Sequence, residues 1–296
     1  MKLAAIDIGS NAIRLLIGEV YEQNGKVNIS KSSLVRLPVR LGADVFETGS
    51  VSPEKAKDFI KGMEAFNIIK NIHEVKGLRA CATSAMRNAK NGKELVKETF
   101  YKTGIEIEII DGQTEADIIL STFHLLSLEK DMPYLYIDVG GGSTEISLLI
   151  NGKAMASSSF NIGTVRMLTG KVKPETRSKM LTWVDHLKSE YQPQKAIGSG
   201  GNINKLIKLC CPLSENEMNI SALRSIYKAM KILTPKERMI NWGLRPDRAD
   251  VIVPASEIYM SVMDHAGIDM ILVPKIGLAD GLLYNMYLEL SKEIDK

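Results

Sequence analysis

One hairpin pattern occurs twice in this sequence. In the first copy Asp7 stands in an apolar run, the polar turn Gly9-Ser10-Asn11 follows, and a second apolar run begins at Ile13. In the second copy Asp138 takes the place of Asp7, and the turn is Gly140-Gly141-Gly142-Ser143-Thr144. Each copy predicts two strands joined by a glycine-containing tip. A spaced repeat of such a unit predicts two similar domains.

The tips of the two hairpins have the composition of an anion site. Glycines lack a Cβ atom, so several backbone N–H groups can point at one phosphate. The carboxylates of Asp138 and Glu145, on either side of the second tip, would repel a phosphate unless a divalent cation such as Mg²⁺ lay between them. The predicted phosphate-binding residues of the tips are Gly9, Ser10, Asn11, Gly140, Gly141, Gly142, Ser143 and Thr144.

Composition excludes several classes of protein. With 45% hydrophobic and 25% charged residues, the chain is typical of a soluble globular protein. No apolar run reaches the ~20 residues of a membrane span. Three cysteines, two of them adjacent, indicate a reducing compartment, and we expect a cytoplasmic location without membrane attachment. A net charge of +3, with few aromatic residues, does not favour nucleic acid as a partner.

The order of the expected elements predicts an α/β protein, because strands and helices alternate in both halves. The expected domains are 1–128 and 129–296, with the seam near 127–133, and the final helix packs on either domain. Expected strands are 3–8, 13–20, 27–37, 75–82, 105–109, 134–139, 145–150, 153–160, 195–197 and 268–273. Expected helices are 53–72, 92–102, 113–126, 174–191, one after Asn202, then 219–233, 235–241, 248–265 and 278–294.

Two further groups of residues are candidates for anion contacts. Arg87 follows a predicted strand and a Thr-Ser pair, and an arginine there can hold a phosphate with two hydrogen bonds. Arg36 and Arg40 either extend this cationic track or lie on a solvated strand face. The four histidines show no metal-ligand spacing.

A set of motifs spread over most of the chain resembles one known family. In order, the motifs are 6–11, 40–42, 82–87, 112–116, 138–145, 198–202, 245–250 and 277–281. They resemble the exopolyphosphatase / guanosine pentaphosphate phosphatase family, a branch of the actin, Hsp70 and sugar-kinase superfamily. The resemblance implies two similar ribonuclease H-like (actin-like ATPase) domains that face each other across a cleft.

The resemblance also implies a reaction. It predicts a hydrolase that removes the terminal phosphate from linear inorganic polyphosphate, or from guanosine pentaphosphate, with Mg²⁺ as cofactor. Glu115 corresponds to the catalytic base. Asp138 and Glu145 correspond to the residues that hold the metal and the attacking water, and Asp7 is a third candidate metal ligand. The loop at Gly200 resembles the nucleotide-facing loop of the superfamily and is a further candidate for phosphate.

The sequence departs from the family pattern in three respects. Thr114 stands where the family often has a first glutamate, and Ala279 and Asp280 replace an arginine and a glutamate. The chain also lacks the C-terminal domains of longer members, so a homodimer is expected. Two other readings stay open: a sugar kinase or actin-like ATPase, and a non-catalytic sensor of guanosine tetraphosphate.

Overall fold

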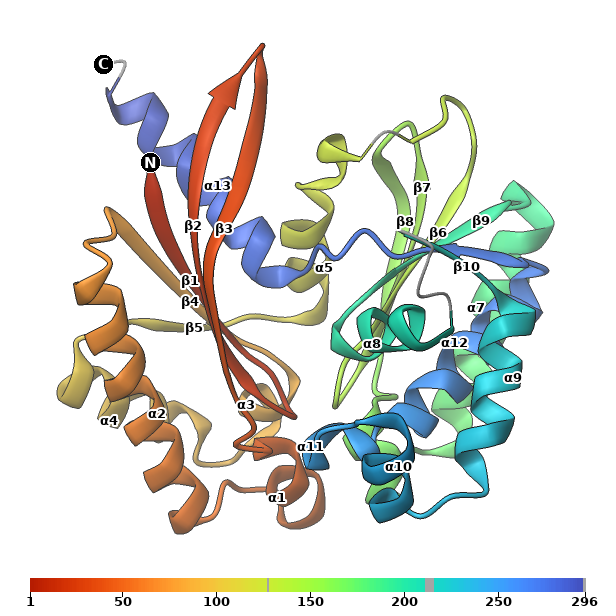
Figure 1. Cartoon of the computed structure of the whole chain (residues 1–296), viewed down its shortest axis with the longest axis horizontal. Coiled ribbons are helices and arrows are strands. Elements are labelled where there is room, and N and C mark those ends of the chain that lie inside the picture. Colours follow the sequence, from red (N-terminus) through yellow and green to blue (C-terminus); the bar gives the residue numbers. More distant parts are fainter. Residues whose placement is uncertain (127, 211–215, 295–296) are drawn as a thin grey trace. The chain divides into compact units, whose positions relative to one another are not determined.

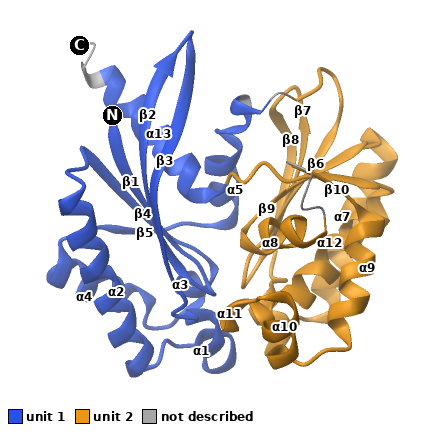
Figure 2. Cartoon of the chain, viewed as in Figure 1, with its two compact units in different colours: residues 1–127, 277–296 blue, residues 128–276 orange. Residues whose placement is uncertain are grey.

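The computed structural model describes residues 1–126, 128–210 and 216–294. The chain divides into two compact units (Figure 2): unit 1 is Met1–Ser127 with Gly277–Lys296, and unit 2 is Leu128–Ile276. Each unit is an α/β structure built on one sheet, as the sequence predicts. Every helix in the described part of the chain is too short or too polar to cross a lipid bilayer.

Unit 1 contains a five-stranded sheet with the strand order β3-β2-β1-β4-β5 (Figure 1). The first three strands form an antiparallel meander, and β4 and β5 continue the sheet in parallel with β1. Strand β1 is buried along almost its whole length, which is why its sequence is apolar except near its ends. The strands are β1 (Lys2–Ile8), β2 (Ile13–Gln23), β3 (Lys26–Leu37), β4 (Gly77–Ala82) and β5 (Ile107–Ile109).

Helices cover both faces of the unit 1 sheet (Figure 1). A Cβ atom at Gly18 of β2 would lie 3.1 Å from Leu283, so the C-terminal helix α13 packs on that face. On the opposite face, a Cβ atom at Gly62 of α2 would lie 3.0 Å from Ile13 and from Leu37. The helices are α1 (Leu41–Thr48), α2 (Pro53–Ile72), α3 (Ser84–Asn88), α4 (Gly92–Thr103), α5 (Gly112–Leu120), a 3₁₀ turn at Phe123–Leu125, and α13 (Leu278–Ile294).

Unit 2 repeats this sheet with one added strand. Its order is β10-β11-β9-β6-β7-β8, so β6, β7, β8, β9 and β11 take the places of β1 to β5, and β10 is an extra antiparallel edge. The shared order confirms the two similar domains predicted from the repeated hairpin, and it agrees with the ribonuclease H-like fold that the family resemblance implies. The strands are β6 (Tyr134–Val139), β7 (Thr144–Ile150), β8 (Lys153–Phe160), β9 (Lys195–Ser199), β10 (Glu217–Asn219) and β11 (Met270–Leu272).

The core of unit 2 lies on one face of its sheet. Alternate residues of the central strand, Leu135, Ile137 and Val139, are buried in one cluster with residues of α7, α9 and α12. The intervening residues Tyr136 and Asp138 therefore point to the other face. The helices are α6 (Thr164–Leu168), α7 (Pro174–Tyr191), α8 (Gly201–Cys210), α9 (Ile220–Lys231), α10 (Pro235–Trp242), α11 (Pro246–Ala249) and α12 (Ile252–Ala266).

Several helix ends follow the local signals in the sequence. Ser52 accepts a hydrogen bond from the backbone N–H of Lys55 at 3.4 Å, directly before Pro53 at the start of α2. Gly104 ends α4 in the left-handed conformation, with φ of 69°. Pro254 lies in the first turn of α12. Backbone N–H groups in the first turn form no hydrogen bond within the helix, so the absence of an N–H at proline costs nothing there.

Two predicted helices have different bounds. The helix predicted at 113–126 ends at Leu120, because the hydroxyls of Ser121 and Thr122 donate to the carbonyls of the preceding turn. The helix predicted at 248–265 is interrupted between α11 and α12. The short helix α1 was not predicted. It begins after Arg40, which has a left-handed φ of 58° and forms no capping hydrogen bond with its side chain, so the sequence carries no cap signal there.

Two of the three cysteines lie among the described residues. Among the described residues, Cys81 and Cys210 form no disulfide, and Cys211 lies outside those residues. Burial raises the pKa of the Cys81 thiol to about 12, so this thiol is inert at neutral pH.

Candidate functional site

The second hairpin places two carboxylates side by side. Asp138 of β6 and Glu145 of β7 are directly opposite each other in the antiparallel pair. Glu145 is only 1% exposed, and the hydroxyl of Ser159 on β8 donates to its Oε1 at 2.8 Å. Opposed residues of neighbouring strands have close side chains, so two like charges share one small region. Such a pair is stabilised by a cation or a proton.

Two tyrosines form hydrogen bonds with Ser199, the β9 residue beside Asp138. Tyr136 shares a 2.7 Å hydrogen bond with Ser199, which is opposite Asp138 on β9. The hydroxyl of Tyr259 on α12 donates to the Ser199 carbonyl at 2.5 Å. Burial raises the pKa of both phenols well above its usual value, and the negative charge of Asp138 raises it further. Both phenols are therefore neutral; the Tyr136 bond joins β6 to β9, and the Tyr259 bond joins α12 to β9.

The triple-glycine tip is held from behind by α6. The N–H of Gly140 donates to the Ser143 carbonyl at 3.0 Å, and the N–H groups at the start of α6 donate to the carbonyls of Gly140 and Gly141. A Cβ atom at Gly163 would lie 2.4 Å from the nitrogen of Gly142, so only glycine permits this approach. Within the described part of the chain, no backbone hydrogen bond uses the N–H of Gly141 or Gly142. Gly141 is partly exposed, so its N–H is a candidate donor to an anion, whereas Gly142 is buried with its nitrogen against Gly163.

Not every predicted tip residue points to a ligand. The hydroxyl of Thr144 donates to the carbonyl of Ile162 at 2.6 Å and is fully buried, so it fastens the tip to the chain before α6. The guanidinium of Arg166 adds a 2.8 Å hydrogen bond from Nε to the Gly142 carbonyl. The carbonyls of the tip thus point toward α6, which holds the loop in place.

The loop after β9 approaches the same carboxylates. Gly200 has a left-handed φ of 99°, and a Cβ atom there would lie 3.0 Å from Oδ1 of Asp138. The next glycine, Gly201, packs on the guanidinium of Arg248, which donates to Asn202 Oδ1 at 2.6 Å. Sequence reasoning assigned no role to Arg248, although its motif was recognised; only the fold brings it to this loop.

The first hairpin has the same geometry and a different charge. Asp7 is opposite Arg14 on β2, and Nη1 of Arg14 lies 3.0 Å from Oδ2 of Asp7. Burial raises the pKa of Asp7, and the charge of Arg14 opposes this shift. Arginine holds the position that Glu145 holds in the second hairpin. The carboxylate of Asp7 already has a cation, so the case for a metal is weaker here than at Asp138.

The tip of the first hairpin supports α1 and carries an unsatisfied hydroxyl. The N–H of Gly42 donates to the Ser10 carbonyl at 2.8 Å, and the N–H of Arg40 donates to the Asn11 carbonyl at 3.2 Å. Among the described residues, the buried hydroxyls of Ser10 and Ser84 have no hydrogen-bond partner. Buried polar groups are nearly always bonded, so these two are candidates to bind a ligand. The sequence pointed to Ser10 but not to Ser84, whose only signal is its place between a strand and Arg87.

The side chain of Arg87 on α3 contacts the turn between β5 and α5, and Glu115 follows that turn. Nη1 of Arg87 donates to the carbonyl of Ile110 at 2.5 Å. Asp111 caps α5 by accepting from the N–H of Thr114 at 2.7 Å, and this hydrogen bond holds the pKa of Asp111 below its usual value. Glu115 then stands in the first turn of α5. Arg87 thus fixes the turn that presents Glu115, and its predicted contact with phosphate stays a prediction.

The carboxylates suit Mg²⁺ better than a metal that needs many protein ligands. In the described residues no three His, Cys, Asp or Glu side chains cluster as a metal site. Mg²⁺ keeps several waters and is commonly held by one or two carboxylates together with substrate phosphates. The Asp138 and Glu145 pair meets that requirement.

Comparison with known proteins identifies the family. Residues 24–290 match the Ppx/GppA phosphatase family. The chain belongs to this family. A bifunctional 3-dehydroquinate synthase/phosphatase of Fusobacterium nucleatum is 30% identical over 300 residues, which cover 91% of this chain and 44% of that protein. This chain therefore spans less than half the length of that relative.

Two further proteins match over almost their whole length. Exopolyphosphatase 2 of Mycobacterium tuberculosis is 26% identical over 314 residues, which cover 96% of this chain and 98% of that protein. The crystal structure of an exopolyphosphatase from Cytophaga hutchinsonii superposes with a TM-score of 0.84 at 23% identity, covering 97% of each chain. The second match shows that the fold is shared.

The structure explains the departure from the family pattern at the start of α13. Oδ2 of Asp280 accepts a hydrogen bond from the N–H of Gly277 at 3.0 Å, and Oδ1 forms a 2.6 Å ion pair with Lys31. A Cβ atom at Gly281 would lie 2.1 Å from the carbonyl oxygen of Ile118 in α5. In this member of the family, the segment fastens α13 to β3 and to the helix of Glu115.

Proposed function

We propose that this protein is a phosphohydrolase that removes the terminal phosphate of linear inorganic polyphosphate by attack of water. The observation that carries the proposal is the pair of opposed carboxylates, Asp138 and Glu145, at the ends of one triple-glycine tip. A bare anion site would not contain them, whereas a phosphate bound together with a divalent cation requires them. Membership of the Ppx/GppA phosphatase family supports the same reaction class.

The residues that would hold the cation are Asp138 and Glu145. When bound, Mg²⁺ would neutralise charge on the phosphate oxygens and so favour their approach to two carboxylates. The hydrogen bond from Ser159 fixes one oxygen of Glu145, and the close approach of Gly200 limits the movement of Asp138. The protein thus presents both carboxylates in fixed positions, as a preorganised site requires.

The remaining residues position phosphate and water. In unit 2, the N–H of Gly141 would donate a hydrogen bond to a phosphate oxygen. In unit 1, the buried hydroxyl of Ser10, which has no partner among the described residues, is a separate candidate donor. Glu115 accepts a proton from the attacking water or orients it. Phosphoryl transfer depends on this positioning and on charge neutralisation more than on covalent catalysis.

The experiment that tests the proposal is a measurement of phosphate release. The wild-type chain and Glu115→Gln are incubated with long-chain polyphosphate, short polyphosphates, guanosine pentaphosphate and ATP, with Mg²⁺ or with EDTA. We expect Mg²⁺-dependent release from polyphosphate. If only guanosine pentaphosphate releases phosphate, the proposed substrate is wrong but the proposed hydrolysis stands. ATP turnover that requires an acceptor sugar, or guanosine tetraphosphate binding without any turnover, would overturn the hydrolase assignment.

Two other expectations from the sequence stay predictions: a homodimer and a cytoplasmic location. Light scattering during size-exclusion chromatography tests the first, and a mass of 32.7 kDa would show a monomer.

A further inference from the structure

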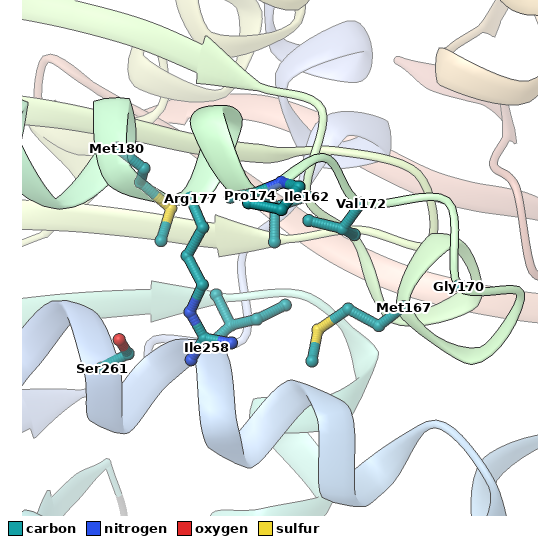
Figure 3. Close-up of a pocket in the computed structure, with 9 residues that line it drawn as sticks. All are labelled: Ile162, Met167, Gly170, Val172, Pro174, Arg177, Met180, Ile258 and Ser261. Atoms are coloured by element: carbon teal, nitrogen blue, oxygen red, sulfur yellow. The ribbon is translucent and has the colours of Figure 1, made fainter.

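Unit 2 contains a cavity that none of the candidate site residues lines. It has a volume of about 380 Å³ and lies among α6, α7 and α12 (Figure 3). Cavities that bind small molecules typically measure ~300–1,000 Å³. The size alone therefore permits a small organic ligand, and the lining decides its chemistry.

The walls of the cavity are mostly apolar. Ile162, Met180 and Ile258 line it and are themselves buried in the unit 2 core, and the thioether of Met167 adds a polarisable contact. These walls favour a hydrocarbon body without hydrogen-bonding groups.

Two polar side chains also line the cavity. Figure 3 shows Arg177 extending from α7 toward α12, the helix that carries Ser261. In the described part of the chain, no ion pair or hydrogen bond involves either side chain, whereas Arg224 and Arg248 of the same unit are both paired. A guanidinium stays charged at any physiological pH and binds a carboxylate with two hydrogen bonds. One cation among the lining residues matches a ligand with one negative charge.

The cavity is linked to the glycine tip through α6. Ile162 and Met167, which line the cavity, lie on either side of residues 163–166. Those residues hold the carbonyls of Gly140 and Gly141 through backbone hydrogen bonds, and the Ile162 carbonyl accepts from Thr144. A ligand that fixes Ile162 and Met167 therefore restrains the tip.

We propose that this cavity binds a small organic monocarboxylate with an apolar body, and that binding restrains the glycine tip through α6. The carboxylate pairs with Arg177 and accepts a hydrogen bond from Ser261. The apolar body fills the space between Met180 and Ile258. This inference does not require the proposed phosphatase reaction, because the binding and its effect on the tip exist with or without that reaction.

Octanoate is the probe for the test, with octan-1-ol as its neutral counterpart and hexanoate as a shorter homologue. Isothermal titration calorimetry of the full chain is expected to show saturable binding of octanoate. Loss of the charge should weaken binding by about tenfold, so octan-1-ol to wild type and octanoate to Arg177→Met should both be weaker. Hexanoate lacks two methylene groups and should bind roughly tenfold more weakly than octanoate. Lys179→Met, which removes a charge from the same helix without lining the cavity, should bind as wild type does.

Two further measurements show whether the variants fold and whether binding affects the glycine tip. Ile258→Trp fills the cavity and should abolish octanoate binding, and thermal melts show whether it folds; Arg177 is exposed, so its variant is not expected to unfold. Hydrogen exchange of residues 140–144 should slow when octanoate is added to wild type and stay unchanged in Arg177→Met.

Three results would overturn the inference. They are absence of saturable octanoate binding to wild type, equal binding by wild type and Arg177→Met, and unchanged exchange at 140–144 when the site is saturated. None of these measurements uses a phosphate substrate, so they separate the failure of this inference from the failure of the proposed reaction.

Discussion

Asp138 of β6 and Glu145 of β7 are directly opposed residues of one antiparallel strand pair. The corresponding pair in unit 1 is Asp7 and Arg14, which neutralise each other. The duplicated fold thus carries a salt bridge in one copy and two acids in the other. This difference is the reason that we propose the second hairpin as the cation site, and it leads to the first prediction.

Ser159→Ala should weaken the use of Mg²⁺. The lost hydroxyl fixes Oε1 of Glu145, and loss of a partner that orients a metal ligand typically costs ~10–100-fold in metal affinity. The Mg²⁺ concentration for half-maximal phosphate release should rise by that factor. Ser157→Ala, which loses only a hydrogen bond to Ser147 on the same strands, serves as the control. Equal Mg²⁺ dependence in the two variants would argue against Glu145 as a ligand.

Glu115→Gln should lower the rate of phosphate release by about 10²–10⁴, the usual cost of a lost general base. Its melting temperature should stay close to that of the wild type, because Gln is isosteric with Glu. The matched control is Asp117→Asn, an exposed acid on the same helix that accepts from Gln113. If both variants keep the wild-type rate, Glu115 is not the base.

Gly200→Ala should lower activity more than stability alone explains. Its φ of 99° costs a Cβ-bearing residue ~1–2 kcal/mol, and the new methyl group would press on Oδ1 of Asp138. Gly152→Ala tests the backbone cost separately, because Gly152 has φ of 71° with open space around it. We expect similar losses of melting temperature in the two variants and a loss of activity in Gly200→Ala only. A fully active Gly200→Ala enzyme would show that the position of Asp138 tolerates this displacement.

Gly281→Ala should destabilise the protein by about 1–3 kcal/mol, the usual cost of overpacking. The added methyl group would lie 2.1 Å from the Ile118 carbonyl oxygen and force α13 away from α5. Because α5 carries Glu115, activity should fall as well. Gly277→Ala meets no neighbouring atom and is the control. Urea denaturation gives both free energies of unfolding, and equal values would contradict the packing described for α13.

Asp7→Asn should stabilise the protein at neutral pH. Burial raises the pKa of Asp7, so the folded state holds its proton more tightly than the unfolded chain does. Ionised Asp7 therefore costs stability, and that cost appears as the pH rises from the ordinary value of 3.8 through the higher folded-state value. Asn removes the cost and still accepts a hydrogen bond from Arg14.

Thermal melts between pH 3 and pH 8 test this. The advantage of Asp7→Asn over wild type should be largest at the upper end and vanish below pH 3.8. The exposed variant Asp58→Asn controls for the loss of one negative charge. A variant that is less stable than wild type at pH 7 would show that the ion pair with Arg14 outweighs the burial of Asp7.

Local patterns predicted much of the fold. The cap at Ser52, the stop at Gly104 and the hairpin after Asp138 depend on residues close in sequence, so they could be recognised in the sequence alone. The end of α5 at Leu120 could not, because hydroxyls that favour helix caps at other positions ended this helix by competing for its carbonyls.

The sequence by itself determined the repeated hairpin, the α/β class and the family, because each depends on residue type and spacing along the chain. Tertiary structure decided which residue each acidic side chain contacts. Strand register paired Asp7 with Arg14 and Asp138 with Glu145, packing brought Arg248 to the Gly200 loop, and α6 came to lie between the glycine tip and an apolar cavity. The pairs within the hairpins depend on strand register, whereas the contacts of Arg248 and of α6 join residues far apart in the chain, which no local preference encodes.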